Sequence, residues 1–173
     1  PTMINEEKIK ILKETGLASI VLGLQGSDRI NKEIYNRRTS KERFLEIAHM
    51  LRKYDIAGRY DIIIRNPYAT EEDEIEVVDT LIKTPKPFII GEYPLAFLPE
   101  TELTKRACND KIISGRLSYY DSPSGFGTES ERFPYLATIR TMSPFTPSRI
   151  SSFFLKIHKR KLGRILIPIY NIC

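Results

Sequence analysis

The sequence predicts an α/β fold built on a small parallel sheet. Three short runs of apolar and β-branched residues, at 18–24, 59–64 and 88–95, are typical of buried strands. They begin about 41 and 29 residues apart, and each gap holds a pattern typical of a helix. Connections of this length suit βα units with right-handed crossovers, which place the strands parallel to one another.

Start and stop signals mark the helices around the first two strands. Gly16 ends a charged stretch before the first strand and suits a helix C-terminus. Ser27 or Asp28 can cap a short helix after that strand. Thr39, with Glu42 three residues later, forms a capping box. The apolar positions of the helix that follows have helical spacing: Phe44, Ile47, Ala48 and Leu51.

The helix after the second strand has a similar beginning and a clear end. Thr70 and Asp73 form another capping pair, and Pro85 and Pro87 stop the helix. Its predicted buried face consists of Ile75, Val78, Leu81 and Ile82. A short helix over 101–107 is expected after the third strand.

The pattern is less regular beyond residue 109. We predict a loop over 118–131, a short helix over 135–142 and an amphipathic helix over 148–162. The apolar side of the last helix is expected to consist of Ile150, Phe153, Phe154 and Ile157. The chain therefore divides into an α/β segment, 1–108, and a loop-rich and helical C-terminal extension, 109–173.

Basic charge is concentrated at the C-terminal end of the chain. There are 27 basic and 22 acidic residues in total, and residues 132–173 contain eight basic residues and no acidic one. Residues 1–131 accordingly hold 19 basic and 22 acidic residues. A basic tail of this kind can contact RNA, an anionic lipid surface or an acidic partner, or it can be a solvated face.

Composition excludes several classes of protein. Hydrophobic residues make up 41% and charged residues 28%, as in folded domains. No apolar run approaches the roughly 20 residues of a membrane span. Two cysteines, Cys108 and Cys173, and two histidines cannot build a disulfide framework or a structural zinc site. We expect a reducing, cytoplasmic setting and no metal ligand within the chain.

Two features predict that the chain is a fragment of a larger unit. It begins at Pro1, and its first methionine, Met3, lies in the approach to a helix. Three parallel strands also make a thin sheet, because such strands need cover on both faces and neighbours on both edges.

Polar and aromatic residues lie at the carboxyl ends of the predicted strands, where α/β folds bind ligands. These segments are 25–28, 65–68 and 93–97. Gln25, beside a helix start, suits a carboxylate or a ribose, or it is a satisfied loop amide. Arg37 could fold back as a carboxylate clamp or be an ordinary surface arginine. Asp61 lies inside a predicted buried strand, where a carboxylate needs a partner. That partner could be a basic side chain in a structural ion pair, or it could be a ligand.

Three motifs, in this order, resemble the second half of a radical S-adenosylmethionine (radical SAM) domain. They are GLQGS at 23–27, YDIIIRNPY at 60–68 and FLPETELT at 97–104. The sequence is most similar to the subgroup that often carries an upstream cobalamin-binding domain. The resemblance implies strands four to six of a partial (β/α)6 TIM-like barrel.

The resemblance also implies a cofactor and its contacts. Radical SAM enzymes cleave S-adenosylmethionine reductively at a [4Fe–4S] cluster to generate a 5′-deoxyadenosyl radical. Arg37 would meet the methionine carboxylate, and Gln25 and Asp61 would lie near the ribose or the amino group. Residues 93–97 would border the adenine or the substrate. The positions expected to bind cofactor are Gln25, Ser27, Arg37, Asp61, Asn66 and Tyr93.

The sequence departs from the family pattern in three places. The turn after the first strand is one residue short, and Glu100 replaces the usual glycine at a turn that calls for positive φ. The CxxxCxxC loop is absent, although three thiolates are needed to hold the cluster. We therefore expect the chain alone to be catalytically silent. The cluster ligands, and any cobalamin site, would lie in a missing N-terminal part.

Two other functions stay open at this point. One is a non-enzymatic remnant or interaction module whose basic tail binds RNA or an anionic surface. The other is a fragment of an unrelated (β/α)8 barrel that acts on a phosphorylated substrate. No glycine-rich phosphate loop follows any of the three strands, which disfavours the second alternative.

Overall fold

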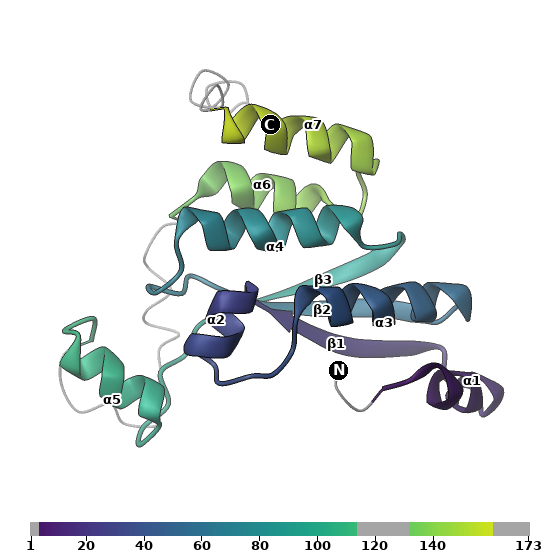
Figure 1. Ribbon diagram of the computed structural model, residues 1–173, viewed down its shortest axis with the longest axis horizontal. Coiled ribbons are helices and arrows are strands. Elements are labelled where there is room, and N and C mark those ends of the chain that lie inside the picture. The colour runs from purple at the N-terminus through teal and green to yellow at the C-terminus, as the bar shows by residue number, and fades with distance from the viewer. Residues whose placement is uncertain (1–3, 114–131, 161–173) are drawn as a thin grey trace.

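Three parallel strands form the centre of the protein (Figure 1). The structure is a computed structural model that describes residues 4–113 and 132–160. Strands β1 (Ser19–Gln25), β2 (Ala57–Ile64) and β3 (Phe88–Pro94) pair in the order β1-β2-β3, and both pairs are parallel. The predicted α/β class and the parallel sheet are therefore confirmed.

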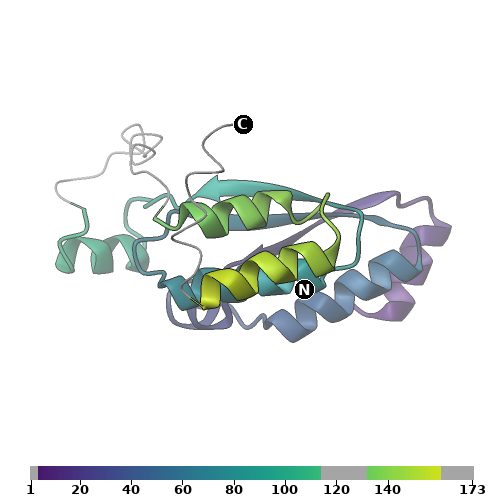
Figure 2. The ribbon, with the colours of Figure 1, turned by 90° about the horizontal axis from the view of Figure 1, so that it is seen from above.

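Helices alternate with the strands and then continue beyond them. They are α1 (Glu6–Glu14), α2 (Asp28–Glu33), α3 (Lys41–Lys53), α4 (Glu71–Lys83), α5 (Glu102–Asn109), α6 (Pro134–Met142) and α7 (Ser148–Lys159). Figures 1 and 2 show α3 and α4 beside the sheet, with α6 and α7 stacked beyond α4. The predicted loop over 118–131 lies outside the described residues.

Side-chain caps fix where the helices begin. Ser27 caps α2, and Thr70 and Asp73 form the reciprocal capping box predicted for α4. The predicted capping box of Thr39 with Glu42 is wrong. Ser40 is the N-cap of α3 and accepts a hydrogen bond from the Arg43 backbone N–H at 3.3 Å. A serine one position later satisfies the same orphan donors, so the helix starts one residue further on.

The main core lies between the sheet and one layer of helices. All four apolar positions predicted for the helix of residues 41–53 are buried, which confirms that helix face. Tyr60 of β2 packs edge-on against Phe44, with ring centroids 4.9 Å apart, and beside Phe88 of β3. Val77 and Leu81 of α4 complete this core.

The opposite face of the sheet is exposed. Side chains alternate along a strand, so Tyr60 and Ile62 enter the core while Arg59 and Asp61 lie on the other face. On that face Val21 is 58% exposed and Ile89 is 64% exposed. None of the described helices covers it, as the view in Figure 2 shows. A parallel sheet with one bare face is consistent with part of an α/β barrel.

The C-terminal helices pack on α4 and build a second core. That core contains Val78, Ile82, Leu136, Ile139 and Leu155. Helix α4 is thus buried on two sides, by the sheet and by α6 and α7. The extension predicted over 109–173 therefore rests on the α/β segment wherever it is described.

Arg140 of α6 fixes that helix through a buried ion pair. Its side chain is 1% exposed. Nη1 lies 2.9 Å from Glu74 Oε2 of α4, and Nε lies 2.7 Å from Glu92 Oε1 of β3. One of the basic residues of the tail is therefore an internal link and not part of a charged surface.

The predicted apolar side of α7 is confirmed in part: Phe154 is partly buried against the second core, whereas two of the other predicted positions are exposed. The structure buries Ser151 and Leu155 and leaves Ile150 and Phe153 exposed. Contacts with α4 and α6 set the rotation of the helix, and these contacts are invisible to the hydrophobic pattern. No helix in the described ranges has the length and apolar character needed to cross a membrane.

Candidate functional site

Polar side chains from all three strands gather on the exposed face of the sheet. Gln25 ends β1, Asp61 lies within β2 and Tyr93 lies near the end of β3. The register places Asp61 between Gly23 of β1 and Gly91 of β3. Three of the predicted positions therefore share one face, toward the carboxyl ends of the strands.

The two glycines make room for these side chains. A Cβ atom at Gly23 would collide with the amide of Gln25, and a Cβ atom at Gly91 would collide with Asp61 Oδ1. The Gln25 amide thus lies across Gly23, and the Asp61 carboxylate lies across Gly91. Any larger residue at position 23 or 91 would push the corresponding polar group out of its position.

Arg59 is a member of this site that the sequence analysis missed. Its Nε lies 3.3 Å from Asp61 Oδ1, and its Nη2 donates a hydrogen bond to the Tyr93 hydroxyl. Its guanidinium carbon also lies 5.9 Å from the centroid of the Tyr93 ring. Residues two apart on a strand share a face, so the spacing of Arg59 and Asp61 was the available signal.

Left-handed backbone conformations end the first two strands. Gln25 has a φ of 66° and Arg65, directly after β2, has a φ of 56°. The register of β1 with β2 also shifts between Gly23 and Gln25. This irregularity turns the chain at the place where the sequence has one residue fewer than the motif that it resembles. The positive φ expected at Glu100 is confirmed, with a value of 64°.

Arg37 lies in a groove at the carboxyl edge of the sheet. The groove has a volume of about 320 Å³ and is lined by Tyr35 and Arg37 from the α2–α3 connection. Ile63 at the end of β2, Leu95 after β3 and Leu103 of α5 form its other walls. An exposed guanidinium beside apolar walls suits a ligand with a carboxylate and a flat apolar part.

Ser27 and Asn66 are buried and hold the surrounding loops. The Ser27 hydroxyl donates to Asp73 Oδ1 at 2.6 Å. The Asn66 amide donates to the Tyr35 hydroxyl at 2.9 Å, and its oxygen accepts from the Tyr68 backbone N–H at 2.9 Å. Neither side chain shares the exposed face with Asp61. Their contacts position the loops after β1 and β2.

Asp73 joins α2 to the start of α4. Burial would raise the pKa of this carboxyl, but hydrogen bonds from Arg29, Ser27 and Thr70 outweigh burial and lower the pKa to about 2. Arg29 donates through Nε at 3.2 Å, and the Thr70 backbone N–H donates at 2.8 Å. Burial also raises the pKa of Tyr35 and outweighs the hydrogen bond that its oxygen accepts from Asn66, so the hydroxyl stays protonated.

The described residues hold no group that could bind a metal cluster. No set of three or more His, Cys, Asp or Glu side chains in residues 4–113 and 132–160 is placed to hold a metal ion. Cys108 is exposed on α5. The described residues therefore do not form a site for an iron–sulfur cluster.

Comparison with known families supports the resemblance seen in the motifs. Residues 1–81 match the family model of the Radical SAM superfamily. The match runs from α1 into α4 and includes β1 and β2, with Gln25, Arg37 and Asp61. Tyr93 lies beyond it. No curated protein matches the chain.

Proposed function

We propose that this chain forms one part of the S-adenosylmethionine site of a radical SAM enzyme. It would be the C-terminal half of a partial (β/α)6 barrel, with β1, β2 and β3 as strands four to six. The observation that carries the proposal is the polar, exposed face of a parallel sheet, within a chain whose first 81 residues match the Radical SAM superfamily. In the complete partial barrel this face would be the interior.

The chemistry of the side chains suits the cofactor. Arg37 offers a fixed positive charge to the methionine carboxylate at the edge of the groove. Gln25 and Asp61 offer an amide and a carboxylate to ribose hydroxyls or to the amino group. Asp61 would share its carboxylate between Arg59 and the cofactor, since one oxygen already faces Arg59 Nε. Residues 93–97 would border the adenine or the substrate.

The cluster that supplies the electron for reductive cleavage would be held by another part of the enzyme. The full sequence has two cysteines, and a site-differentiated [4Fe–4S] cluster needs three thiolates. We propose that an N-terminal half-barrel supplies those ligands. It would face the exposed side of the sheet across the barrel interior and pair with the edge of β1. The order of the three sequence motifs supports a cobalamin-dependent enzyme as the complete protein.

Nuclear magnetic resonance of the full chain tests the cofactor contacts directly. The ¹⁵N-labelled protein is titrated separately with methionine, adenosine and S-adenosylmethionine. Methionine should shift backbone amides around Arg37, and adenosine should shift those around Asp61 and residues 93–97. S-adenosylmethionine should shift both sets. Arg37→Gln should abolish the response to methionine, because the carboxylate loses its cationic partner.

The matched control is Arg38→Gln, which removes an equal charge from the neighbouring exposed residue. That variant should keep the methionine response. Shifts confined to other surfaces, or no shift at millimolar S-adenosylmethionine, would contradict the proposed site.

A further inference from the structure

We propose that the outer face of α7 binds an anionic membrane surface. This outer face consists of Arg149, Ile150, Phe153, Lys156 and Arg160. The proposal goes beyond the radical SAM function and does not depend on it. Four of these residues, 149, 153, 156 and 160, are spaced as i, i+4, i+7 and i+11, so they form one stripe along the helix.

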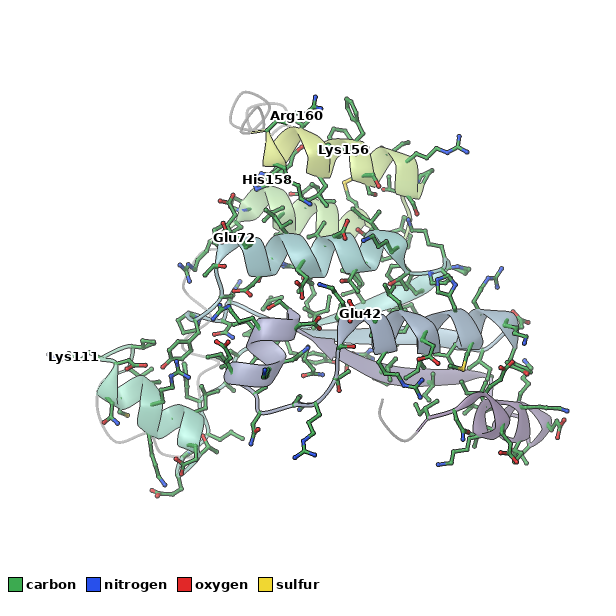
Figure 3. All side chains as sticks on the ribbon, viewed as in Figure 1. Glu42, Glu72, Lys111, Lys156, His158 and Arg160 are labelled. Atoms are coloured by element: carbon green, nitrogen blue, oxygen red, sulfur yellow. The ribbon has the colours of Figure 1, made fainter. Side chains whose placement is uncertain are left out.

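The rotation of α7 is fixed by contacts on its inner side. Leu155 is buried in the core shared with α4 and α6. His158 Nε2 lies 2.8 Å from Glu71 Oε1 of α4, and the His158 ring stacks on Tyr135 of α6 with centroids 5.2 Å apart. Lys156, His158 and Arg160 are labelled in Figure 3, where α7 is the outermost helix. The outer face therefore points away from α4.

Large apolar side chains are exposed on this face and beside it. Phe153 is 59% exposed, and Phe145, in the turn before α7, is 86% exposed. Ile150 and Met142 are also exposed. Ile150 and Phe153 are three positions apart on the helix and so adjoin one another, and adjoining exposed apolar side chains of this size mark an interaction surface more often than a solvated one.

The side chains of α6 and α7 themselves include basic residues and no acidic one. Residues 132–160 contain six basic residues and no acidic one. Two of them have partners within the protein. Arg140 forms the buried ion pair, and Arg132 donates hydrogen bonds to the backbone carbonyls of Pro67 and Ala69. The others are exposed and form no ion pair among the described residues: Arg149, Lys156, Lys159 and Arg160.

The combination favours a lipid surface over other anionic partners. A basic helix face that also exposes phenylalanine and isoleucine lies in the interface between headgroups and acyl chains. Nucleic-acid sites use aromatic rings for stacking, and an aliphatic side chain such as Ile150 offers no such face. A second copy of the chain would bring equal positive charges together, so it is disfavoured.

Vesicle co-sedimentation of the full chain tests the proposal. The chain should sediment with phosphatidylcholine vesicles that contain roughly a third phosphatidylserine, and not with pure phosphatidylcholine vesicles. Raising the salt to about 0.5 M should release it, because screening shortens the range of the attraction. Lys156→Gln with Arg160→Gln should weaken binding about 20- to 30-fold, from about 1 kcal/mol per basic residue. Phe153→Ser should also weaken binding, by about tenfold.

A double variant on the α/β segment serves as the charge-matched control. Lys10→Gln with Lys32→Gln removes two exposed charges far from α7 in sequence and should leave vesicle binding unchanged. Equal binding to both kinds of vesicle, or an equal loss in the control, would overturn the proposal. So would a single-stranded RNA that displaces the chain from vesicles through the same residues, or a dimer that Phe153→Ser dissociates.

Discussion

Glu100 adopts a left-handed backbone conformation, with a φ of 64°, in the turn before α5. An L-residue pays about 1–2 kcal/mol for that conformation, and glycine does not. Glu100 is exposed, and the turn continues into the Thr101 cap of α5. Because the side chain is exposed, the free-energy cost at this position comes from the backbone conformation.

Glu100→Gly should stabilise the chain by about 1 kcal/mol, because glycine relieves the steric cost of the left-handed backbone. Urea unfolding followed by circular dichroism measures the change. Glu100→Ala is the control, since it removes the same side chain and keeps the Cβ atom. If the two variants are equally stable, backbone conformation is not the cause.

The lowered pKa of Asp73 predicts how the free energy of unfolding depends on pH. Its pKa is about 2 in the folded chain against an ordinary value of 3.8. A lowered carboxyl pKa contributes stability that is present above the unfolded value and is lost as the pH falls through the folded value. Asp73 should contribute about 2 kcal/mol at neutral pH and nothing below about pH 2.

Asp73→Asn should therefore be less stable than the parent chain at pH 7 by about that amount, and the difference should shrink between about pH 4 and pH 2. Urea unfolding at several pH values measures it. Asp79→Asn on the same helix is the control. Its carboxylate forms an exposed pair with Lys83 at 2.6 Å, a kind worth less than about 1 kcal/mol. A difference for Asp73→Asn that stays constant down to pH 2 would contradict the linkage.

At the scale of elements, α7 shows the limit of a hydrophobic pattern. Ile150, Phe153, Phe154 and Ile157 lie on one side of the helix, and Leu155 lies apart from them. The face that meets α4 and α6 carries Ser151 and Leu155, while His158 reaches Glu71. Packing against α4 and this hydrogen-bonded contact decide the rotation of the helix.

Leu155→Ala should destabilise the chain by about 2–4 kcal/mol, because it leaves a cavity in the second core. Phe153→Ala removes a larger side chain but should cost less than about 0.5 kcal/mol, because Phe153 is exposed. Thermal or urea unfolding of both variants gives the comparison. A greater loss for Phe153→Ala would mean that the helix is rotated from the position described.

At the scale of the whole molecule, the sheet has one covered face and one bare face. The bare face carries exposed Val21 and Ile89 beside the polar group of Arg59, Asp61 and Tyr93. A barrel interior holds such a mixture when it surrounds a cofactor. This arrangement is why a second half-barrel is part of the proposed function.

The chain alone should produce no 5′-deoxyadenosine from S-adenosylmethionine after reconstitution with iron and sulfide under a strong reductant. The reason is that two cysteines cannot supply the three thiolates of the cluster. Chromatography of the reaction products measures the outcome, with a complete radical SAM enzyme as the positive control. Product formation that scales with the concentration of this chain would refute the expectation.

The sequence by itself determined the elements and their order. Strand periodicity, the capping box of Thr70 with Asp73 and the stop at Pro85 act over a few residues, so the local pattern contains them. The same locality explains why Gln25 and Asp61 could be placed toward the carboxyl ends of the strands. The cap of α3 was misplaced by one residue because Thr39 and Ser40 are both competent caps.

Only the tertiary structure decided which side chains meet. The contact of Arg59 with Tyr93, the space that Gly91 leaves for Asp61, and the burial of Arg140 between Glu74 and Glu92 all join residues from different elements. Such contacts depend on strand register and on helix rotation. Those are set by the packing of surfaces far apart in the chain, which local sequence preferences do not encode.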